Sequence, residues 1–402
     1  MNIQDIMTLD GEHYMNTFGK RVPICFERGQ GVALTDTEGK TYIDFLAGIA
    51  TNALGYAHPG FTEAICQQAG KILHCSNYFY IEQQAQLAAA LCEHTCADRV
   101  FFGSTGAEAN ECAIKLARKY FSAHNEDRFE IISANDSFHG RTLATLAATG
   151  QPRLQEGFSP LPSGFVHVPF GDIHAVKTAI TPHTAAVLIE PIQGEGGVFE
   201  GGTDYLQALR TLCDEQGILL IFDEVQTGMG RTGTLFAYQG YGVEPDIFTS
   251  AKALGNGIPI SACLCKEYVS AFQPGDHGTT LGGNPMSCTA GLFMVRTMTQ
   301  PGFLEHVNDI AAYFKQLLST LMQKLPQQIV DIRGRGLLLG VQLQDDIPVT
   351  SVKSALAERG FIIGTAGNNT LRFVPPLIIE KEHVDALLPA FEETLQQKGK
   401  KC

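Results

Sequence analysis

The sequence predicts an α/β fold: a large domain with a mostly parallel sheet covered by helices on both faces, and a small α+β domain built from both termini. Short, continuous apolar runs recur through the middle of the 402-residue chain, and longer amphipathic segments separate them. Apolar runs without polar alternation are typical of strands buried on both faces, which in a parallel sheet are joined by crossover helices.

The large domain begins its strand–helix alternation near residue 99. Six strands are predicted, over residues 99–104, 129–136, 185–192, 217–225, 246–253 and 260–267. Helices are expected between them, most clearly over 107–123 and 202–217. Because ligands bind at the carboxyl ends of the strands in such sheets, the chemistry is expected there.

The two ends of the chain carry a different pattern. Residues 31–46 predict a strand pair around a Glu-Gly turn. After about residue 301 the pattern is a long helix, strands within 329–343, a helix, strands within 360–376 and a last helix. A chain of this length exceeds a single core. We therefore expect a small domain of residues 1–55 and 301–402 beside a large domain of residues 56–300.

Composition argues against several classes of function. The formal net charge of −13 disfavours nucleic acid as a partner, and the basic cluster at 398–402 is expected to be a frayed terminus. The 11 cysteines lack a matched zinc-ligand spacing, so we expect no metal and reduced thiols. The chain shows neither a signal pattern nor an apolar run near the ~20 residues of a membrane helix. A soluble, cytoplasmic protein without a membrane partner is expected.

Two glycine-containing segments resemble nucleotide-binding loops but lack their context. The segment GMGRTG at 228–233 fits the dinucleotide fingerprint, yet the strand before it ends in Asp-Glu, and the acids about 20 residues later lie in a Pro-containing loop. The segment EGKT lies in the predicted hairpin, with Leu34 where a P-loop has its first glycine. Neither nucleotide function is favoured.

Asp223 and Lys252 are the most informative pair. Asp223 ends the apolar run GILLIFD, where a carboxylate is costly unless it meets a cation such as a protonated pyridine. Lys252 lies in the small, neutral stretch SAKALGNG, where burial lowers the pKa of an amine and makes it nucleophilic. An acid and an imine-forming amine are what pyridoxal phosphate needs as an electron sink. Taken singly, each residue also has a structural explanation, a helix-capping carboxylate or a solvated lysine.

A helix N-terminus follows the strand at 99–104. Thr105 and Glu108 form a T-x-x-E capping box, and the N–H groups of Thr105, Gly106 and Ala107 can face an anion. Thr280 in DHGTTLGGNP is a second candidate phosphate donor. A simple strand-to-helix turn is the alternative interpretation.

The segment SFHGRT places an aromatic ring and a cation after the next strand. Phe138 can stack on a flat ring, and Arg141 can clamp a carboxylate in bidentate fashion. His139 is more often an oriented core histidine than a catalytic base. Glu195 follows another strand end, and Arg372 lies in the terminal domain. Neither residue by itself indicates a function.

Together these segments resemble the class III, fold type I pyridoxal phosphate aminotransferases over nearly the whole chain. The shared motifs occur in the family's order: STGAEAN, FHGRT, EPIQGEGG, FDEVQTGMGRTG, SAKALGNG, TTLGGNP and LRFVPP. Within the family the chain is most similar to acetylornithine aminotransferases, with ornithine and succinylornithine enzymes close by.

The resemblance implies how pyridoxal 5′-phosphate is held. Lys252 would bind it covalently and later move a proton, and Asp223 would keep the pyridine nitrogen protonated. Gln226 would contact the phenolic oxygen of the cofactor. Val225 and Phe138 would pack against the two faces of its ring. The phosphate would be bound by Thr105, Gly106, Ala107 and the partner subunit's Thr280. The active site would therefore require a homodimer.

The resemblance also implies the reaction, transfer of the terminal amino group of N-acetylornithine to 2-oxoglutarate in arginine biosynthesis. Arg141 would hold the distant carboxylate of either substrate, and Arg372 the α-carboxylate of glutamate. Glu195 would pair with Arg372 when the donor lacks that carboxylate.

The identity of the donor depends on fewer residues. Ile49 stands where ornithine enzymes carry a tyrosine that recognises a free α-amine, which favours an acylated donor or 4-aminobutyrate. Tyr78 and Ser104 depart from the common acetylornithine pattern and leave the acyl group open. Succinylornithine, ornithine and 4-aminobutyrate remain alternative donors. A catalytically silent binding protein is a further alternative, against which the retention of Lys252 and Asp223 argues.

Overall fold

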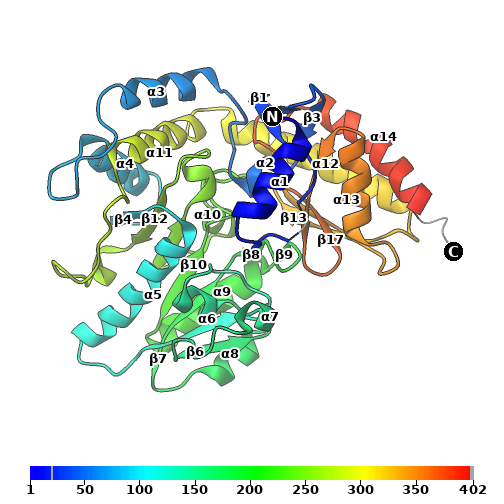
Figure 1. Cartoon of the computed structure of the whole chain (residues 1–402). Helices are drawn as coiled ribbons and strands as arrows, with labels where there is room; N and C mark the ends of the chain where they lie inside the picture. The colour runs from blue at the N-terminus through cyan, green and yellow to red at the C-terminus, as the bar shows by residue number, and fades with distance from the viewer. Residues whose placement is uncertain (20, 399–402) are drawn as a thin grey trace.

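A seven-stranded sheet forms the centre of the large domain (Figure 1). The computed structural model describes residues 1–19 and 21–398, so most of the predicted basic tail lies outside the described residues. The strand order is β4-β12-β11-β10-β7-β5-β6. Their bounds are β4 Arg99–Gly103, β5 Glu130–Ala134, β6 Phe165–Val168, β7 Thr184–Ile189, β10 Leu219–Asp223, β11 Ile247–Ser250 and β12 Ser261–Cys265. All six predicted strands are confirmed, and the edge strand β6 was not predicted.

Strand β12 is the exception to the parallel pattern. The strands β11, β10, β7, β5 and β6 run parallel, whereas β12 is antiparallel to both β11 and β4. A parallel connection needs a crossover of a dozen or more residues. The segment between β11 and β12 holds only the 3₁₀ helix Lys252–Leu254 and a turn, so the chain reverses direction there.

Helices cover both faces of this sheet, as predicted. Along β10, Leu219 and Ile221 belong to a hydrophobic cluster with α5 (Gly106–Ala123), while Leu220 and Phe222 belong to a second cluster with α9 (Gly202–Gln216). Successive side chains of a strand point to opposite faces, so every residue of β10 is buried. This explains the continuous apolar run that ends in Asp223.

Segments from both ends of the chain pair in the small domain. The predicted hairpin is confirmed as the antiparallel pair β2–β3, and β3 pairs in parallel with β15 from the other end of the chain. One sheet holds β1 Phe26–Gln30, β2 Ala33–Asp36, β3 Thr41–Asp44 and β15 Phe361–Ile362; another holds β13 Ile329–Arg335, β14 Leu338–Leu343, β17 Thr370–Phe373 and β16 Gly364–Ala366. The pairing supports a division at residues 55 and 300, which remains our proposal.

The other elements frame these sheets. The remaining long helices are α1 Ile3–His13, α3 Pro59–Ala69, α4 Glu82–Glu93, α11 Pro285–Met298, α12 Phe303–Lys324, α13 Val349–Glu358 and α14 Lys381–Lys398. The short elements are α2 Ala47–Ala50, α6 Leu143–Ala148, α7 Pro152–Gln155, α8 Ile173–Ala179, α10 Ala237–Tyr241, β8 Ile192–Gln193 and β9 Phe199–Glu200. Within the described part of the chain, no helix combines the length and the apolar character needed to cross a membrane.

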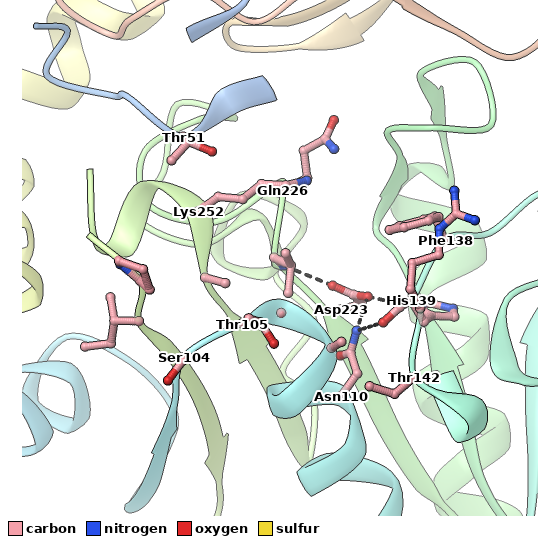
Figure 2. A pocket seen from close by; sticks show the side chains of 18 of the residues that line it. Thr51, Ser104, Thr105, Asn110, Phe138, His139, Thr142, Asp223, Gln226 and Lys252 are labelled. Atoms are coloured by element: carbon pink, nitrogen blue, oxygen red, sulfur yellow. Dashed lines mark hydrogen bonds and ion pairs between the residues drawn. The ribbon is translucent and has the colours of Figure 1, made fainter. Parts of the chain in front are cut away.

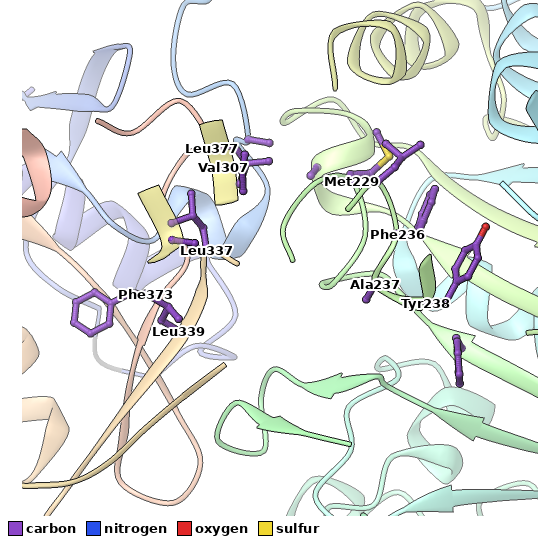
Figure 3. Close-up of a cluster of buried hydrophobic side chains, with 14 of the residues drawn as sticks. Met229, Phe236, Ala237, Tyr238, Val307, Leu337, Leu339, Phe373 and Leu377 are labelled. Carbon is purple, nitrogen blue, oxygen red and sulfur yellow. The ribbon is translucent and has the colours of Figure 1, made fainter. Parts of the chain in front are cut away.

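A shared core joins the two domains. One hydrophobic cluster contains Met229 and Phe236 of the large domain together with Leu339 and Phe373 of the terminal domain (Figure 3). Close-packed interiors are nearly incompressible, so elements that share a core keep fixed relative positions. The shared cluster therefore fixes the position of β17 relative to the large domain.

Candidate active site

A cavity of about 530 Å³ lies at the carboxyl edge of the central sheet (Figure 2). Strand ends, the first turn of α5 and the loop after β5 supply its walls. The predicted site residues that line it are Thr105, Gly106, Ala107, Phe138, Arg141, Glu195, Asp223, Val225, Gln226 and Lys252. The tertiary structure thus brings residues from five separate motifs to one place.

The first turn of α5 forms one end of the cavity. The predicted capping box is present: Glu108 N–H donates to Thr105 Oγ1 at 3.2 Å, and Thr105 N–H donates to Glu108 Oε2 at 2.8 Å. Thr105 N–H is therefore occupied by Glu108, whereas the Thr105 side chain lines the cavity, and the role of Thr105 in binding phosphate stays a prediction. Across residues 1–19 and 21–398, no acceptor is recorded for the N–H groups of Gly106 and Ala107. Those two groups, at the positive end of the helix, can bind an anion.

Gly106 also permits a close approach. A Cβ at this position would lie 2.8 Å from Val225 Cγ1, closer than real Cβ contacts come. Val225 follows Asp223 and donates its N–H to Asp223 Oδ1 at 3.0 Å. Because Gly106 has no side chain, Val225 can occupy its place in the cavity wall without a clash.

Asp223 is held by three donors from different segments. Its Oδ2 accepts from Asn110 Nδ2 at 2.7 Å and lies 2.8 Å from His139 Nδ1, and its Oδ1 accepts from Val225 (Figure 2). Asp223 is 4% exposed and His139 2% exposed. Hydrogen bonds and a facing imidazole stabilise a carboxylate that burial would otherwise disfavour. His139 is therefore the oriented core histidine that the sequence favoured.

Lys252 lies two residues after the end of β11 and lines the cavity. Its backbone adopts a left-handed conformation with φ of 45°, which costs roughly 1–2 kcal/mol for a residue with a Cβ. Burial lowers its pKa to about 8, partly opposed by the charge of Glu195. A larger fraction of uncharged amine near neutral pH makes Lys252 a competent nucleophile. The alternative of a solvated surface lysine does not fit this position.

A buried carboxyl supports the wall that carries Phe138. Glu190 accepts hydrogen bonds from the N–H of Phe138 at 3.1 Å and of Gly194 at 3.3 Å. Burial, and then the charge of Asp223, raise the pKa of Glu190 well above its usual value. Arg141 is exposed, with its guanidinium 5.5 Å from the Phe138 ring centroid. Among the described residues no ion pair of Arg141 is recorded, so its charge can meet a ligand.

Arg372 reaches the site from β17 of the terminal domain. Its Nη1 lies 2.5 Å from Glu195 Oε1, and also donates to Gly194 O at 2.9 Å and Gln226 Oε1 at 3.2 Å. Although burial acts against it, the charge of Arg372 holds the pKa of Glu195 below its usual value. Arg372 itself is 2% exposed and lies behind Glu195 rather than on the cavity wall. Glu195 therefore screens Arg372 from the cavity in this structure.

Two predicted residues do not reach the cavity of the single chain. Ile49 is 42% exposed in the short turn α2, where Ala47 and Ala50 are buried instead, and Thr51 is the residue of this segment that lines the cavity. Thr280 is exposed and does not line the cavity either. Both roles stay predictions, and that of Thr280 requires a second subunit.

Sequence reasoning missed Asn110 and Thr249. Thr249 Oγ1–H donates to Asn110 Oδ1 at 2.8 Å, and Asn110 lines the cavity. One signal for Asn110 was present, since it lies four residues after Gly106 and so shares a helix face with it.

These residues fit a flat, phosphorylated pyridine. The anion-binding turn, the Gly106 opening that leaves room beside Val225, the buried carboxylate and the amine surround one cavity. An anionic phosphate suits the helix N-terminus, and a protonated ring nitrogen suits Asp223. The donor set thus matches pyridoxal 5′-phosphate.

Comparison with known proteins gives a consistent result. A family model described as aminotransferase class-III matches residues 14–395. The chain is 49% identical to an acetylornithine aminotransferase from a Nostoc species, over 95% of this chain and 91% of the relative. It is 47% identical to one from Methanocaldococcus jannaschii, over 99% of each.

Solved structures agree with the fold. The ornithine aminotransferase from Toxoplasma gondii aligns with a TM-score of 0.94 at 31% identity, covering 99% of this chain and 96% of that one. The N-acetylornithine aminotransferase from Stenotrophomonas maltophilia aligns with a TM-score of 0.82 at 34% identity, covering 97% of this chain and 98% of that one.

Proposed function

This chain belongs to the class-III aminotransferases, which use pyridoxal phosphate, and we propose that it moves the terminal amino group of N-acetylornithine to 2-oxoglutarate. The products are N-acetylglutamate semialdehyde and glutamate. The observation that carries the proposal is the pairing of Arg372 with Glu195 beside an exposed Arg141. Arg141 is available to every substrate. Arg372 is masked by Glu195 until a substrate brings a second carboxylate.

The chain's own groups divide the work in the reaction. The cofactor, when bound, supplies an aldehyde that takes up the amino group and a ring that stores the electron pair. Lys252 Nζ would hold the cofactor covalently and, once freed by the amine donor, would carry the proton that the substrate carbon loses. Asp223 would stabilise the positive charge at the ring nitrogen. The N–H groups of Gly106 and Ala107 would hold the phosphate.

The two half-reactions place different demands on Arg372. The terminal carbon of N-acetylornithine bears no carboxylate, so Glu195 stays paired with Arg372 and Arg141 binds the distant carboxylate. Glutamate brings an α-carboxylate to the same place, where it can replace Glu195 on Arg372 through a bidentate pair. Glu195 is only partly buried, which allows it to move aside.

The donor is proposed from two kinds of support. Relatives at 46–49% identity carry the name acetylornithine aminotransferase. Ile49 lacks the hydroxyl that would recognise a free α-amine. Ornithine is the second candidate, because the Toxoplasma gondii ornithine aminotransferase aligns over nearly the whole chain.

We also propose a homodimer. The segment with Tyr78, Phe79 and Tyr80 is 95%, 69% and 106% exposed. Asn77 Nδ2 ties it to the loop of Thr280 by donating to Thr279 O and Gly282 O, both at 3.1 Å. Exposed aromatic clusters are typical of protein interfaces. A second copy on this surface would cover these rings and carry Thr280 to the neighbouring site.

A cytoplasmic role in arginine biosynthesis completes the proposal. Ten cysteines of the described residues are free thiols, which suits a reducing compartment. The biosynthetic role follows from the proposed substrate.

The test is a half-reaction assay. Purified protein loaded with pyridoxal 5′-phosphate is mixed singly with N-acetylornithine, N-succinylornithine, ornithine and 4-aminobutyrate, and loss of the visible absorption band is timed. We expect the band to bleach fastest with N-acetylornithine. Faster bleaching with another amine would reassign the donor, and a protein that stays colourless with added cofactor would overturn the proposal.

A further inference from the structure

Asn110 joins three parts of the site through one buried amide. It lies on α5, is 1% exposed, and donates from Nδ2 to His139 O at 2.8 Å and to Asp223 Oδ2 at 2.7 Å. Its Oδ1 accepts from Thr249 Oγ1 on β11 at 2.8 Å. Both amide donors and one acceptor site are thus used. A single side chain connects the phosphate-binding helix, the Phe138 loop and the carboxylate.

The orientation of this amide follows from its neighbours. Both atoms near Nδ2, a backbone carbonyl and a carboxylate, can only accept, so they require the NH₂ group. Thr249 supplies the only hydroxyl recorded against Oδ1 among the described residues. Rotating the amide by half a turn would place its oxygen against two acceptors. Thr249 therefore favours one orientation of Asn110.

Asn110 in turn restricts Asp223. The Oδ2 atom of Asp223 is shared by Asn110 and His139, and Oδ1 receives the N–H of Val225 (Figure 2). Three donors from three segments fix the plane of the carboxylate. A buried carboxylate that loses one of its donors is free to turn, and its remaining oxygen atoms are less well satisfied.

We propose that Asn110 is a positioning residue that aims the Asp223 carboxylate at the cofactor's ring nitrogen, with Thr249 acting through it. The inference rests on the proposed function, because it concerns the same cofactor site. It assigns Asn110 a specific effect on the charge of the ring and not only on the fold. Hydrogen bonds to a charged group are strong enough for their loss to be measured.

The test compares buried variants of similar shape. Asn110→Leu removes the amide, Thr249→Val removes only the hydroxyl, and Thr249→Ser keeps it. Thr394→Val is the matched control, since this buried threonine of α14 donates to Ala390 O at 2.7 Å away from the site. The measurements are the dissociation constant for pyridoxal 5′-phosphate, the pH profile of its absorption band on the protein, and the melting of the cofactor-free protein.

The proposal gives an ordered set of results. For Asn110→Leu we expect the dissociation constant to rise about ten- to a hundredfold and the pH profile to shift. Thr249→Val should move both in the same direction by less, Thr249→Ser should restore them, and Thr394→Val should match wild type. If Asn110→Leu fails to fold, the two Thr249 variants decide the question.

The proposal is overturned if Asn110→Leu, or Thr249→Val where only that variant folds, keeps the wild-type affinity and pH profile. It is also overturned if Thr249→Ser behaves like Thr249→Val. Wild-type protein that binds the cofactor and is bleached by an amine preserves the proposed function in either case. Wild-type protein that binds no cofactor overturns both proposals.

Discussion

Arg372 Nη1 lies 2.5 Å from Glu195 Oε1, although the two residues are 177 positions apart in the chain. Strand β17 of the terminal domain brings the guanidinium to the loop that follows β8 of the large domain. The pair neutralises a buried charge that would otherwise face the cavity. In the proposed reaction this pair would open when a substrate carboxylate takes the place of Glu195 on Arg372.

The first prediction concerns this pair. Glu195→Ala should expose Arg372 and favour substrates that carry an α-carboxylate. We expect the ratio of half-reaction rates, L-glutamate over N-acetylornithine, to rise about tenfold, equivalent to ~1.4 kcal/mol. Glu195→Gln, which keeps the shape and loses the charge, should give an intermediate ratio. An unchanged ratio in both variants would contradict the switching role.

The second prediction concerns the pH dependence of stability. Burial lowers the pKa of Lys252 from 10.5 to about 8, so the folded protein releases this proton earlier than the unfolded chain. Stability of the cofactor-free protein should therefore gain a contribution as pH rises from about 8 to about 10.5. Lys252→Met should remove that contribution, as measured by urea unfolding across this range. The exposed Lys177→Met is the control, and parallel profiles for wild type and Lys252→Met would count against the shift.

The third prediction concerns the close approach at Gly106. Gly106→Ala should press on Val225, and we expect cofactor affinity to fall about tenfold, or ~1.4 kcal/mol. Adding Val225→Ala should recover part of the affinity, because it removes the methyl groups that collide. Gly70→Ala, whose new Cβ would meet nothing closer than 3.6 Å, is the control. Equal affinity in Gly106→Ala and wild type would show that Val225 does not define the ring face.

The fourth prediction tests whether Thr280 acts across a subunit interface. Thr280→Val and Lys252→Ala homodimers should each lack activity at limiting cofactor. After the two are mixed and allowed to exchange subunits, half of the dimers should contain one complete site, so we expect about a quarter of wild-type activity. No gain on mixing, with exchange verified by mass spectrometry, would mean that Thr280 does not serve the neighbouring site.

Much of the site could be predicted because it sits at strand ends. Asp223 ends β10 and Lys252 lies two residues after the end of β11; these strands are parallel, and parallel strands end at the same edge of a sheet. Their placement at one edge of the sheet therefore followed from the strand pattern, whereas the pairing of β10 with β11 was decided by the fold. Thr105 shows the limit of that reasoning. The capping box was predicted correctly, yet its consequence, that Glu108 occupies the Thr105 N–H, appeared only in the structure.

The partners of Asp223 could not be predicted. His139 and Asn110 reach it from separate segments, and their meeting depends on how α5 is rotated against the sheet. Ile49 is a residue whose place in the site was expected from the sequence but is not seen in the single chain. It was expected in the substrate site, but the turn α2 leaves it on the surface of the single chain.

The sequence by itself determined the strand–helix alternation, the acid and the amine at the ends of two strands, and the capped turn at the start of α5, because these follow from local periodicity and capping. Only the tertiary structure decided which donors hold Asp223, which N–H groups remain for an anion, and how Arg372 is masked by Glu195. Those outcomes depend on side-chain distances of about 3 Å between segments far apart in the chain, and packing of the two domains against one core sets them.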